Sequence, residues 1–126
     1  MDIKHEGPRN LGFVLSESNR TRSYETVTIA AGSGKLKPGT VLGIVTADET
    51  YTISANAEVV GSEGAETAKA ILAYGVDATD DDVEALVMAR DGEVKKLMLV
   101  IDDSVDDDTK IAAKHTQLAA VGIIVR

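Results

Sequence analysis

Residues 25–46 contain the pattern that most restricts what this chain can fold into. Residues 26–29 alternate polar and apolar side chains, which is the period of a β-strand with one buried face. Residues 37–40, Lys-Pro-Gly-Thr, combine the fixed φ of a proline with a glycine that tolerates positive φ, as a type II turn requires. Residues 41–45 form a short apolar run that is typical of a buried strand. We therefore predict two strands with a looped connection at the centre of the domain.

Further strands are predicted on both sides of the acidic stretch that begins near residue 77. Short strands are expected over residues 51–53, 67–74 and 123–125. Arg90-Asp91-Gly92 lies between two apolar runs, and an Asp-Gly pair in that position predicts a hairpin. We expect its two long antiparallel strands over residues 83–89 and 93–101.

The stretch 102–121 changes to the period of a helix. One face of this helix is expected to carry Ile111, Ala112, His115, Leu118 and Ala119. Ser104 is the expected N-cap, and Gly122 is placed to end the helix. The fold class is therefore α+β and mostly β, in one small domain with a C-terminal helix.

The first 24 residues do not read as a packed part of that domain. They are mostly polar, apart from a five-residue apolar island that holds the only Phe of the chain: Leu11, Gly12, Phe13, Val14 and Leu15. Ordering an island that is tethered at both ends costs conformational entropy, so it is better suited to an arm that adds to another chain. We predict an N-terminal arm over residues 1–24 and a β-rich domain over residues 25–126. A first strand of the domain's own sheet remains the alternative, and only that alternative predicts a large loss of thermal stability in Phe13→Ala.

Composition narrows the class of protein. The chain has 126 residues, the length of one domain, and no cysteine, which excludes disulfides, thiolate metal sites and a thiol nucleophile. No apolar run reaches the roughly 18–20 residues that cross a bilayer, and no signal peptide opens the chain. We expect a soluble protein that is made in the cytoplasm and does not enter a membrane.

Charge is unevenly spread along the chain, whose net charge is −8. Residues 1–40 carry four acids and six bases, a net charge of +2, whereas residues 77–108 carry twelve acids and three bases, a net charge of −9. A chain with this overall charge repels phosphate backbones, so direct nucleic-acid binding is not expected. The acidic block is interpreted as a solvated surface, with a patch that faces a basic partner as the alternative.

One motif looks like a nucleotide site and does not meet its requirements. Gly32-Ser33-Gly34-Lys35 has the glycines and the lysine of a phosphate-binding loop. The position that needs the first glycine holds Ile29, and Leu36 follows the lysine where Ser or Thr is needed. A glycine-rich loop between strands is the better interpretation.

The remaining polar clusters nominate no catalytic, cofactor or metal site. The aspartate runs at residues 80–82 and 102–108 lack the central glycine and closing glutamate of a calcium loop. His5 and His115 have no partner at the spacing of a zinc site or a catalytic triad. We therefore expect a protein that is not an enzyme and that uses no cofactor or metal.

With these residues in view, the chain resembles the head decoration proteins of tailed bacteriophages, the family typified by the lambda capsid-stabilising protein. The resemblance covers most of residues 15–126. It rests on short phrases in a fixed order: LSE at 15–17, TRS at 21–23, ETVTI at 25–29, LKPGTVLG at 36–43, AIL at 70–72, VDA at 76–78 and QLAAVGIIVR at 117–126.

The resemblance implies a β-tulip-like domain that forms a homotrimer and binds the outside of an expanded phage or prophage head at threefold and quasi-threefold positions. Its partner would be the major capsid protein, its location the exterior of the virion after assembly in the host cytoplasm, and its role to stabilise the head against DNA pressure. In that family the N-terminal segment contacts the shell. The arm hypothesis therefore assigns capsid binding to Leu11, Gly12, Phe13, Val14, Leu15, Arg20 and Arg22.

Two other classes stay open on the residues alone. A small ligand- or carbohydrate-binding module would also lack catalytic residues, but it usually presents exposed aromatic side chains, and this chain has one Phe, three Tyr and no Trp. A carboxylate enzyme such as a glycosidase would need two acids that face one pocket. The acids here cluster in turns and at the start of the helix.

Overall fold

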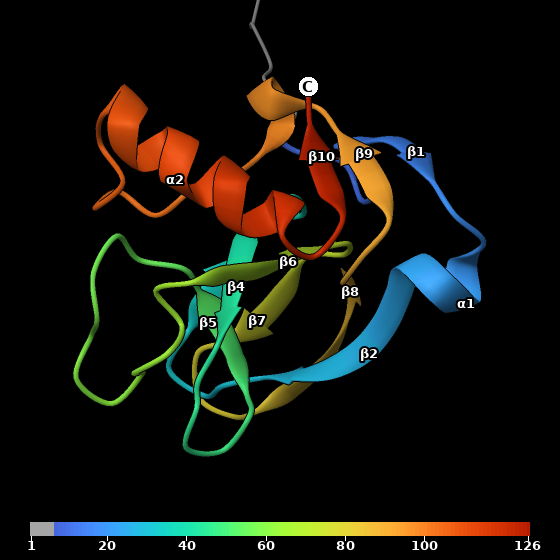
Figure 1. The fold of residues 1–126 in the computed structure, drawn as a ribbon. Helices are drawn as coiled ribbons and strands as arrows, with labels where there is room; N and C mark the ends of the chain where they lie inside the picture. The colour runs from blue at the N-terminus through green and yellow to red at the C-terminus, as the bar shows by residue number, and fades with distance from the viewer. Residues whose placement is uncertain (1–6) are drawn as a thin grey trace, which may run out of the picture.

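β2 (Tyr24–Ile29) carries the alternation seen in the sequence and is one strand of a closed five-stranded barrel (Figure 1). The computed structural model describes residues 7–126 of the chain. The barrel has the strand order β2–β5–β4–β6–β8. Its other strands are β4 (Val41–Ile44), β5 (Tyr51–Ile53), β6 (Ala68–Leu72) and β8 (Val83–Met88). The two strands predicted at the centre of the domain are therefore both barrel strands, but β5 lies between them.

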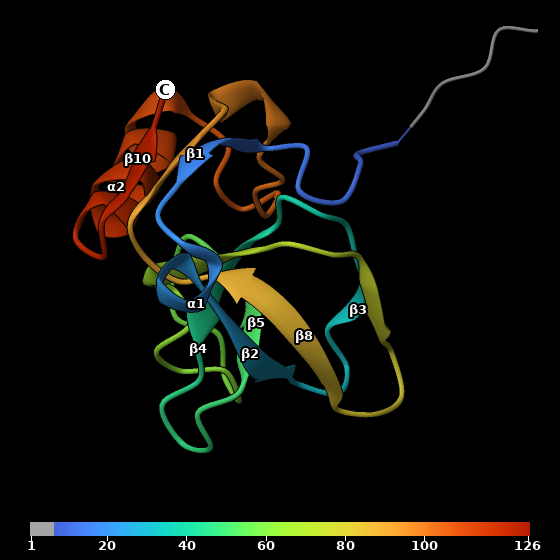
Figure 2. The same ribbon diagram turned by 90° about the vertical axis from the view of Figure 1, so that its right-hand side faces the viewer.

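A three-stranded sheet and a helix cover one end of the barrel (Figures 1 and 2). In this sheet β9 (Gly92–Val94) is central, antiparallel to β1 (Val14–Glu17) and parallel to β10 (Ile123–Val125). The remaining elements are α1 (Arg20–Ser23), the β3 (Gly34–Leu36) and β7 (Val76–Ala78) pair, the 3₁₀ turn η1 (Lys96–Met98) and α2 (Asp108–Ala119). The described residues are thus mostly β, with one long helix near the C-terminal end, as the sequence predicted.

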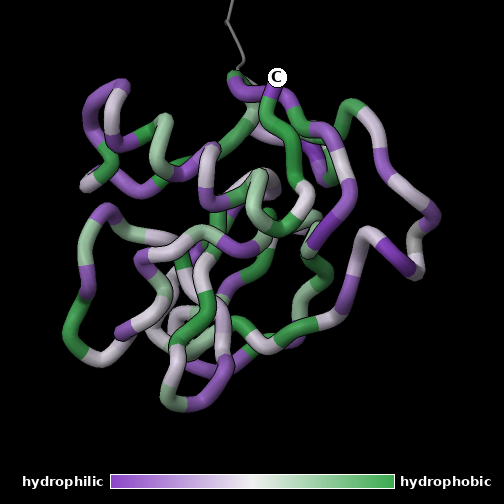
Figure 3. Tube along the Cα trace, in the orientation of Figure 1, coloured by the Kyte–Doolittle hydropathy of each residue, from purple (hydrophilic) through white to green (hydrophobic). Residues whose placement is uncertain are grey.

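β6 and β8 are buried on both faces, and the two faces belong to different cores. Ala70, Leu72 and Val87 belong to the core inside the barrel. Ile71 and Met88, which alternate with them, belong to the core between the barrel and the second sheet. A strand that is covered on both faces reads as a continuous apolar run, as residues 70–72 and 85–88 do, whereas Lys69 and Glu84 precede these runs where the strands are less covered. Figure 3 shows the apolar positions gathered in the central strands, while α1 and the outer turns are mainly hydrophilic.

The predicted type II turn at residues 37–40 is confirmed. Gly39 has φ 93°, and Thr40 N donates to Lys37 O at 3.2 Å. A Cβ atom on Gly39 would lie 2.5 Å from the carbonyl oxygen of Met98, so this turn also requires glycine for space. Residues 31–33 form the expected loop, and the chain re-enters a strand at Gly34.

The predicted hairpin across residues 83–101 is wrong. β8 pairs with β2 and β6 in the barrel, whereas β9 pairs with β1 and β10 in the second sheet. Asp91, at φ 50°, turns the chain from one sheet into the other. Residues 95–101 contain η1 where the second long strand was expected. An Asp-Gly pair reports a change of direction but not the pairing of the next strand, and here β9, with Val94 buried, joins the second sheet.

α2 begins later than predicted. Its N-cap is Asp107, whose side chain accepts from Lys110 N at 2.8 Å. Ser104 Oγ instead accepts from Asn56 N at 2.9 Å and ties the loop after β5 to the loop before the helix. Gly122, with φ 86°, ends the helical segment close to where it was expected.

The buried face of α2 differs from the predicted stripe. Lys114 and Leu118 are buried and Ile111 is half-buried, while Ala112 and Ala119 are exposed. The buried residues therefore have the spacing of a helix face, but Lys114 is buried where Ala112 and Ala119 were expected to be.

Candidate functional site

Phe13, the centre of the predicted arm, lies in the core of the domain. It is 1% exposed and packs with Leu118 and Ile123 between the barrel and the second sheet. The alternative that the sequence left open, a strand of the domain's own sheet, is what β1 forms beside β9. Phe13 is therefore not available for direct contact with another molecule in this conformation.

Backbone hydrogen bonds hold the same segment on the domain. Leu11 N donates to Ala73 O at 2.9 Å, and Lys95 N donates to Phe13 O at 2.7 Å. Leu11 also has φ 59°, an uncommon value that the surrounding contacts must maintain. Residues 11–17 are thus positioned by the domain, and only chain N-terminal to them is left for a separate arm.

The other predicted capsid-binding residues are spread over two places. Leu11, Gly12 and Val14 are half-buried beside Phe13, and Leu15 is 46% exposed on β1. Arg22 lies on α1, exposed, with its Nε 2.7 Å from Asp91 Oδ2. The side chain of Arg20 lies outside the described residues. Capsid binding by this set stays a prediction.

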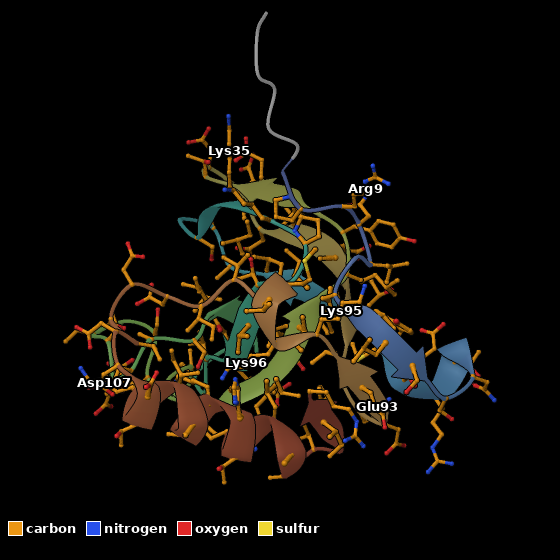
Figure 4. The ribbon with its side chains drawn as sticks, turned by 90° about the horizontal axis from the view of Figure 1, so that it is seen from above. Arg9, Lys35, Glu93, Lys95, Lys96 and Asp107 are labelled. Atoms are coloured by element: carbon orange, nitrogen blue, oxygen red, sulfur yellow. The ribbon has the colours of Figure 1, made fainter. Side chains whose placement is uncertain are left out.

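An exposed apolar turn lies where residues 7–12 reach the domain. η1 lies at the same end of the molecule as these residues and Arg126 (Figures 1 and 4). Leu97 is 95% exposed, and Met98 beside it is also exposed. Lys96 N donates to Arg126 O at 2.9 Å, which fixes the turn against the last strand. This surface was not predicted from the sequence, because residues 93–101 were expected to form a strand.

The same end is basic in a chain of net charge −8. Figure 4 views it directly and shows Lys95 and Lys96 at η1 and Arg9 further away, with Glu93 and Asp107 in the same view. Neither lysine forms an ion pair with any residue in the described part of the chain. Arg126 donates to Glu93 at 3.1 Å, and this hydrogen bond and charge hold the pKa of Glu93 below its usual range.

His115, half-buried on α2, forms no defined site. Burial, and then the positive charge of Lys96, lower the pKa of His115. Its Nε2 is buried and forms no hydrogen bond with a described residue. The neutral imidazole is therefore favoured at this position, which agrees with the prediction of a helix-face residue at the edge of the core.

A polar cleft lies on a different face, along β2. Its lining includes Glu25, Tyr51, Lys69, Arg90 and Asp91. Glu25 forms an ion pair with Arg90 at 2.7 Å, and Asp91 forms one with Arg22 of α1. Burial, and then the charge of Glu25, raise the pKa of Tyr51. The two acids in this cleft are each held by a guanidinium group, so neither is an unpaired carboxyl group.

Potential metal ligands do not gather anywhere in residues 7–126. No group of three or more His, Cys, Asp and Glu side chains in that range is arranged to hold an ion. None of the helices in the same range has the length and apolar character that a membrane crossing requires.

A barrel covered by a second sheet, with apolar and basic side chains exposed at one end, defines a small β-rich domain suited to contact with a larger surface. The sequence model of one family, bacteriophage lambda head decoration protein D, matches residues 3–123. The chain belongs to this family, as its resemblance indicated. A comparison with curated individual proteins found no match. Family membership supports a role in decorating the phage capsid, and hence a location on the capsid of the virion.

Proposed function

We propose that this protein binds the outside of an expanded phage head as a homotrimer, at threefold and quasi-threefold positions, and holds neighbouring capsid subunits together against DNA pressure. Family membership supports capsid decoration. The observation that carries the proposal is the exposed apolar turn at the end where residues 7–12 reach the domain, with Leu97 95% exposed. We propose that this end faces the capsid.

The energetics favour a multivalent attachment. Burying an apolar side chain such as Leu97 contributes about 1.5–3 kcal/mol, so one subunit with η1 alone would bind weakly. Three such ends on one trimer bind together, because the second and third contacts form at an effective concentration that can reach the millimolar range. The same surface that is weak in a monomer then becomes a firm attachment.

Charge supports the same orientation. Lys95 and Lys96 face outward at this end (Figure 4), while the acidic run of residues 80–82 lies in the turn between β7 and β8, away from η1 (Figure 2). A basic end on an acidic protein is attracted to an acidic surface and orients the molecule as it approaches. The remaining acidic surface keeps the protein away from phosphate groups, which supports the expectation of no direct nucleic-acid binding.

We keep the N-terminal segment in the proposed capsid contact, but Phe13 does not touch the capsid. Leu11, Gly12, Val14, Leu15 and the arginines of α1 are proposed to contact the capsid directly or to border the contact. Phe13 acts indirectly, because its burial fixes β1 and the adjoining residues against the domain.

The proposed role is mechanical, not catalytic, and uses no cofactor. The ion pairs of Glu25 and Asp91 support this, since a glycosidase-like pair needs a carboxyl group free to exchange a proton. A carbohydrate-binding module is the second candidate, but Tyr51 in the cleft is buried, and the exposed Tyr74 does not line it. No feature of the described residues favours that candidate over decoration.

Electron microscopy of the protein mixed with expanded and unexpanded heads tests the proposal. We expect trimeric density on expanded heads at threefold and quasi-threefold sites, with unexpanded heads bare. Leu97→Ser should weaken attachment at least tenfold at unchanged oligomeric mass. Asp81→Ser, also exposed but in the turn between β7 and β8 away from η1, is the matched control and should bind normally.

Wild-type attachment of Leu97→Ser, or equal decoration of both kinds of head, would contradict the proposal. The arm itself is tested by deleting residues 2–8. A longer deletion through residue 20 would remove β1 and Phe13, and would therefore confuse loss of the contact with loss of the fold.

A further inference from the structure

We propose that the cleft along β2 receives the tip of the loop between β5 and β6, residues 58–61, from a second copy of this chain. The inference deepens the homotrimer of the proposed function and rests on it, because it assigns the surfaces through which the subunits join. Two separate features carry it: an incompletely paired strand at the cleft, and an exposed apolar loop tip on another side of the molecule.

The cleft exists because the barrel is barely closed on one side of β2. β2 pairs with β8 over its whole length, from Tyr24 opposite Met88 to Ile29 opposite Val83. On its other side it pairs with β5 only at Ile29 and Tyr51. Two hollows that share Ile44 and Tyr51 follow β2 along this open side, and the larger has a volume of about 560 Å³.

Backbone groups of Thr26 face this open side without a partner. Ser23 O accepts from Ala89 N on the β8 side, whereas Ala30 N donates to Tyr51 O on the β5 side. Since backbone groups alternate along a strand, those of Thr26 point to the β5 side. Neither its N–H nor its C=O bonds to a residue in the described part of the chain. An unpaired strand edge of this kind is a template for an extended segment of another chain.

The cleft also holds an uncompensated cation and an apolar floor. Lys69 lines it and forms no ion pair with any residue among 7–126, whereas Arg90 is already paired with Glu25. Ile44, Ala89 and Val121 contribute apolar surface beside them. An occupant that fits would be extended, would carry at least one apolar side chain and would bring one negative charge.

The loop tip has this chemistry. Val60 is 95% exposed and Val59 beside it is also exposed. Glu58, two residues before Val60, is exposed and pairs with no residue in the described range. The two adjacent valines form a small exposed apolar surface that contact with another molecule would remove from water. Glu58 and Val60 thus match the lysine and the apolar floor of the cleft.

The loop is held in shape before any contact forms. Lys114 Nζ donates to Ala55 O and to Glu66 O, which closes the base of the loop. Thr46 N donates to Glu63 O at 2.9 Å, which ties the far side of the loop to the chain after β4. A loop ordered in advance loses little conformational entropy on binding, so a small contact area becomes sufficient.

The two surfaces lie on different sides of the molecule. In Figure 1 the loop projects on the side opposite to α1 and the start of β2. The tip of one copy therefore cannot fill its own cleft while both face outward. A contact between two unlike surfaces is heterologous, and copies joined in this way form a closed ring when the rotation between them closes.

Charge exchange tests the contact. Lys69→Glu and Glu58→Lys should each raise the trimer dissociation constant at least tenfold, measured by sedimentation velocity, with circular dichroism to verify folding. The double variant should return close to the wild-type constant, because it restores the pair with its signs exchanged. Unchanged trimer mass in both single variants and in Val60→Ser would overturn the inference.

The absence of cysteine from the chain allows a direct test. Mixing Val60→Cys with Thr26→Cys and oxidising should give a covalent dimer, while either variant alone should not. Val60→Cys mixed with Thr79→Cys, which is exposed outside the cleft, is the matched control. The absence of a specific cross-link between Val60→Cys and Thr26→Cys would overturn the inference. Binding of wild-type trimers to expanded heads is measured in parallel and tests the proposed function separately. If the wild type binds expanded heads and the variants are still trimeric, the inference fails and the proposed function stands.

Discussion

Phe13 changes the interpretation of the whole N-terminal segment. As the only Phe of an aliphatic chain it reads from sequence as the anchor of an arm, because nothing between residues 1 and 24 shows which partner its ring packs against. The structure supplies that partner from residues more than 80 positions away, such as Val94 and Leu118. A short apolar island cannot reveal from sequence alone whether its partner lies in the same chain.

The first prediction concerns this residue. Phe13→Ala should lower the free energy of unfolding by about 3–5 kcal/mol, because it removes a buried ring from a closely packed core. Leu15→Ala, at a 46% exposed position two residues further on, should change it by about 0.5 kcal/mol or less. Urea unfolding of both variants measures the difference. Equally small losses of unfolding free energy in both variants would instead support an exposed Phe13 on an arm.

Lys114 is a second residue whose role the sequence concealed. It is 2% exposed, and its Nζ donates to Ser54 Oγ at 2.9 Å as well as to the carbonyl oxygens of Ala55 and Glu66. Three acceptors satisfy the three donors of an ammonium group. Its position between Ile111 and Leu118 placed it on the apolar stripe, but lysine is rarely assigned to a buried position. The spacing was the only signal, and the residue type argued against it.

The second prediction uses this lysine. Lys114→Met should destabilise the protein at neutral pH, because each buried acceptor left unpaired costs about 1–3 kcal/mol. Hydrogen exchange should also become faster in residues 55–66, whose base the ammonium group holds. Lys35→Met, an exposed lysine in β3 that lines neither the cleft nor the loop, is the control and should leave this exchange unchanged.

The third prediction is the pH dependence of the same residue. Burial lowers the pKa of Lys114 in the folded state below its ordinary value of 10.5. Between the folded and the unfolded pKa the unfolded chain holds more protons, so this group makes folding more favourable as pH rises through that window. The stability of the wild type relative to Lys114→Met should therefore increase as pH approaches 10.5, in urea titrations at a series of pH values. A difference that does not change with pH would contradict the assignment.

At the scale of elements, the sequence predicted the strands whose patterns are local. β2, β4, β5 and β10 were recognised because alternation or a short apolar run is a property of a few consecutive residues. The pairing of β9 could not be recognised, since it depends on β1 and β10, which lie about 75 residues before and 30 residues after it. The same distance in sequence explains why the cleft was not predicted, whereas the basic, apolar end was missed because residues 93–101 were predicted to be a strand.

The fourth prediction separates two candidate caps of α2. Asp107→Ala should cost about 0.5–2 kcal/mol, because it removes the acceptor of Lys110 N, while Asp107→Asn should remain close to the wild type. Ser104→Ala should leave the helix intact and loosen the loop at Asn56 instead. Thermal unfolding, with hydrogen exchange of the first turn of α2, measures both effects. A larger helix effect in Ser104→Ala would show that the predicted cap was correct.

At the scale of the whole molecule, the barrel and the second sheet cannot be treated as separate folding units. β6 and β8 contribute to both cores, so loss of one core exposes apolar surface of the other.

The fifth prediction is a single unfolding transition. Tyr24 lies in one core and Tyr51 in the other, so variants that lack the exposed Tyr74 and keep only one of these two report each core by fluorescence. The two urea midpoints should coincide after correction for the substitutions, and two distinct midpoints would contradict a shared core.

The closure of the barrel has a mechanical consequence. β2 is joined to β8 by six residue pairs and to β5 by a single one. A tensile load that draws these strands apart would therefore concentrate on the β2–β5 seam, and the barrel would rupture there before any other ladder yields. A neighbour seated across that seam would share the load, so a ring of subunits would have a higher yield point than the sum of its separate members.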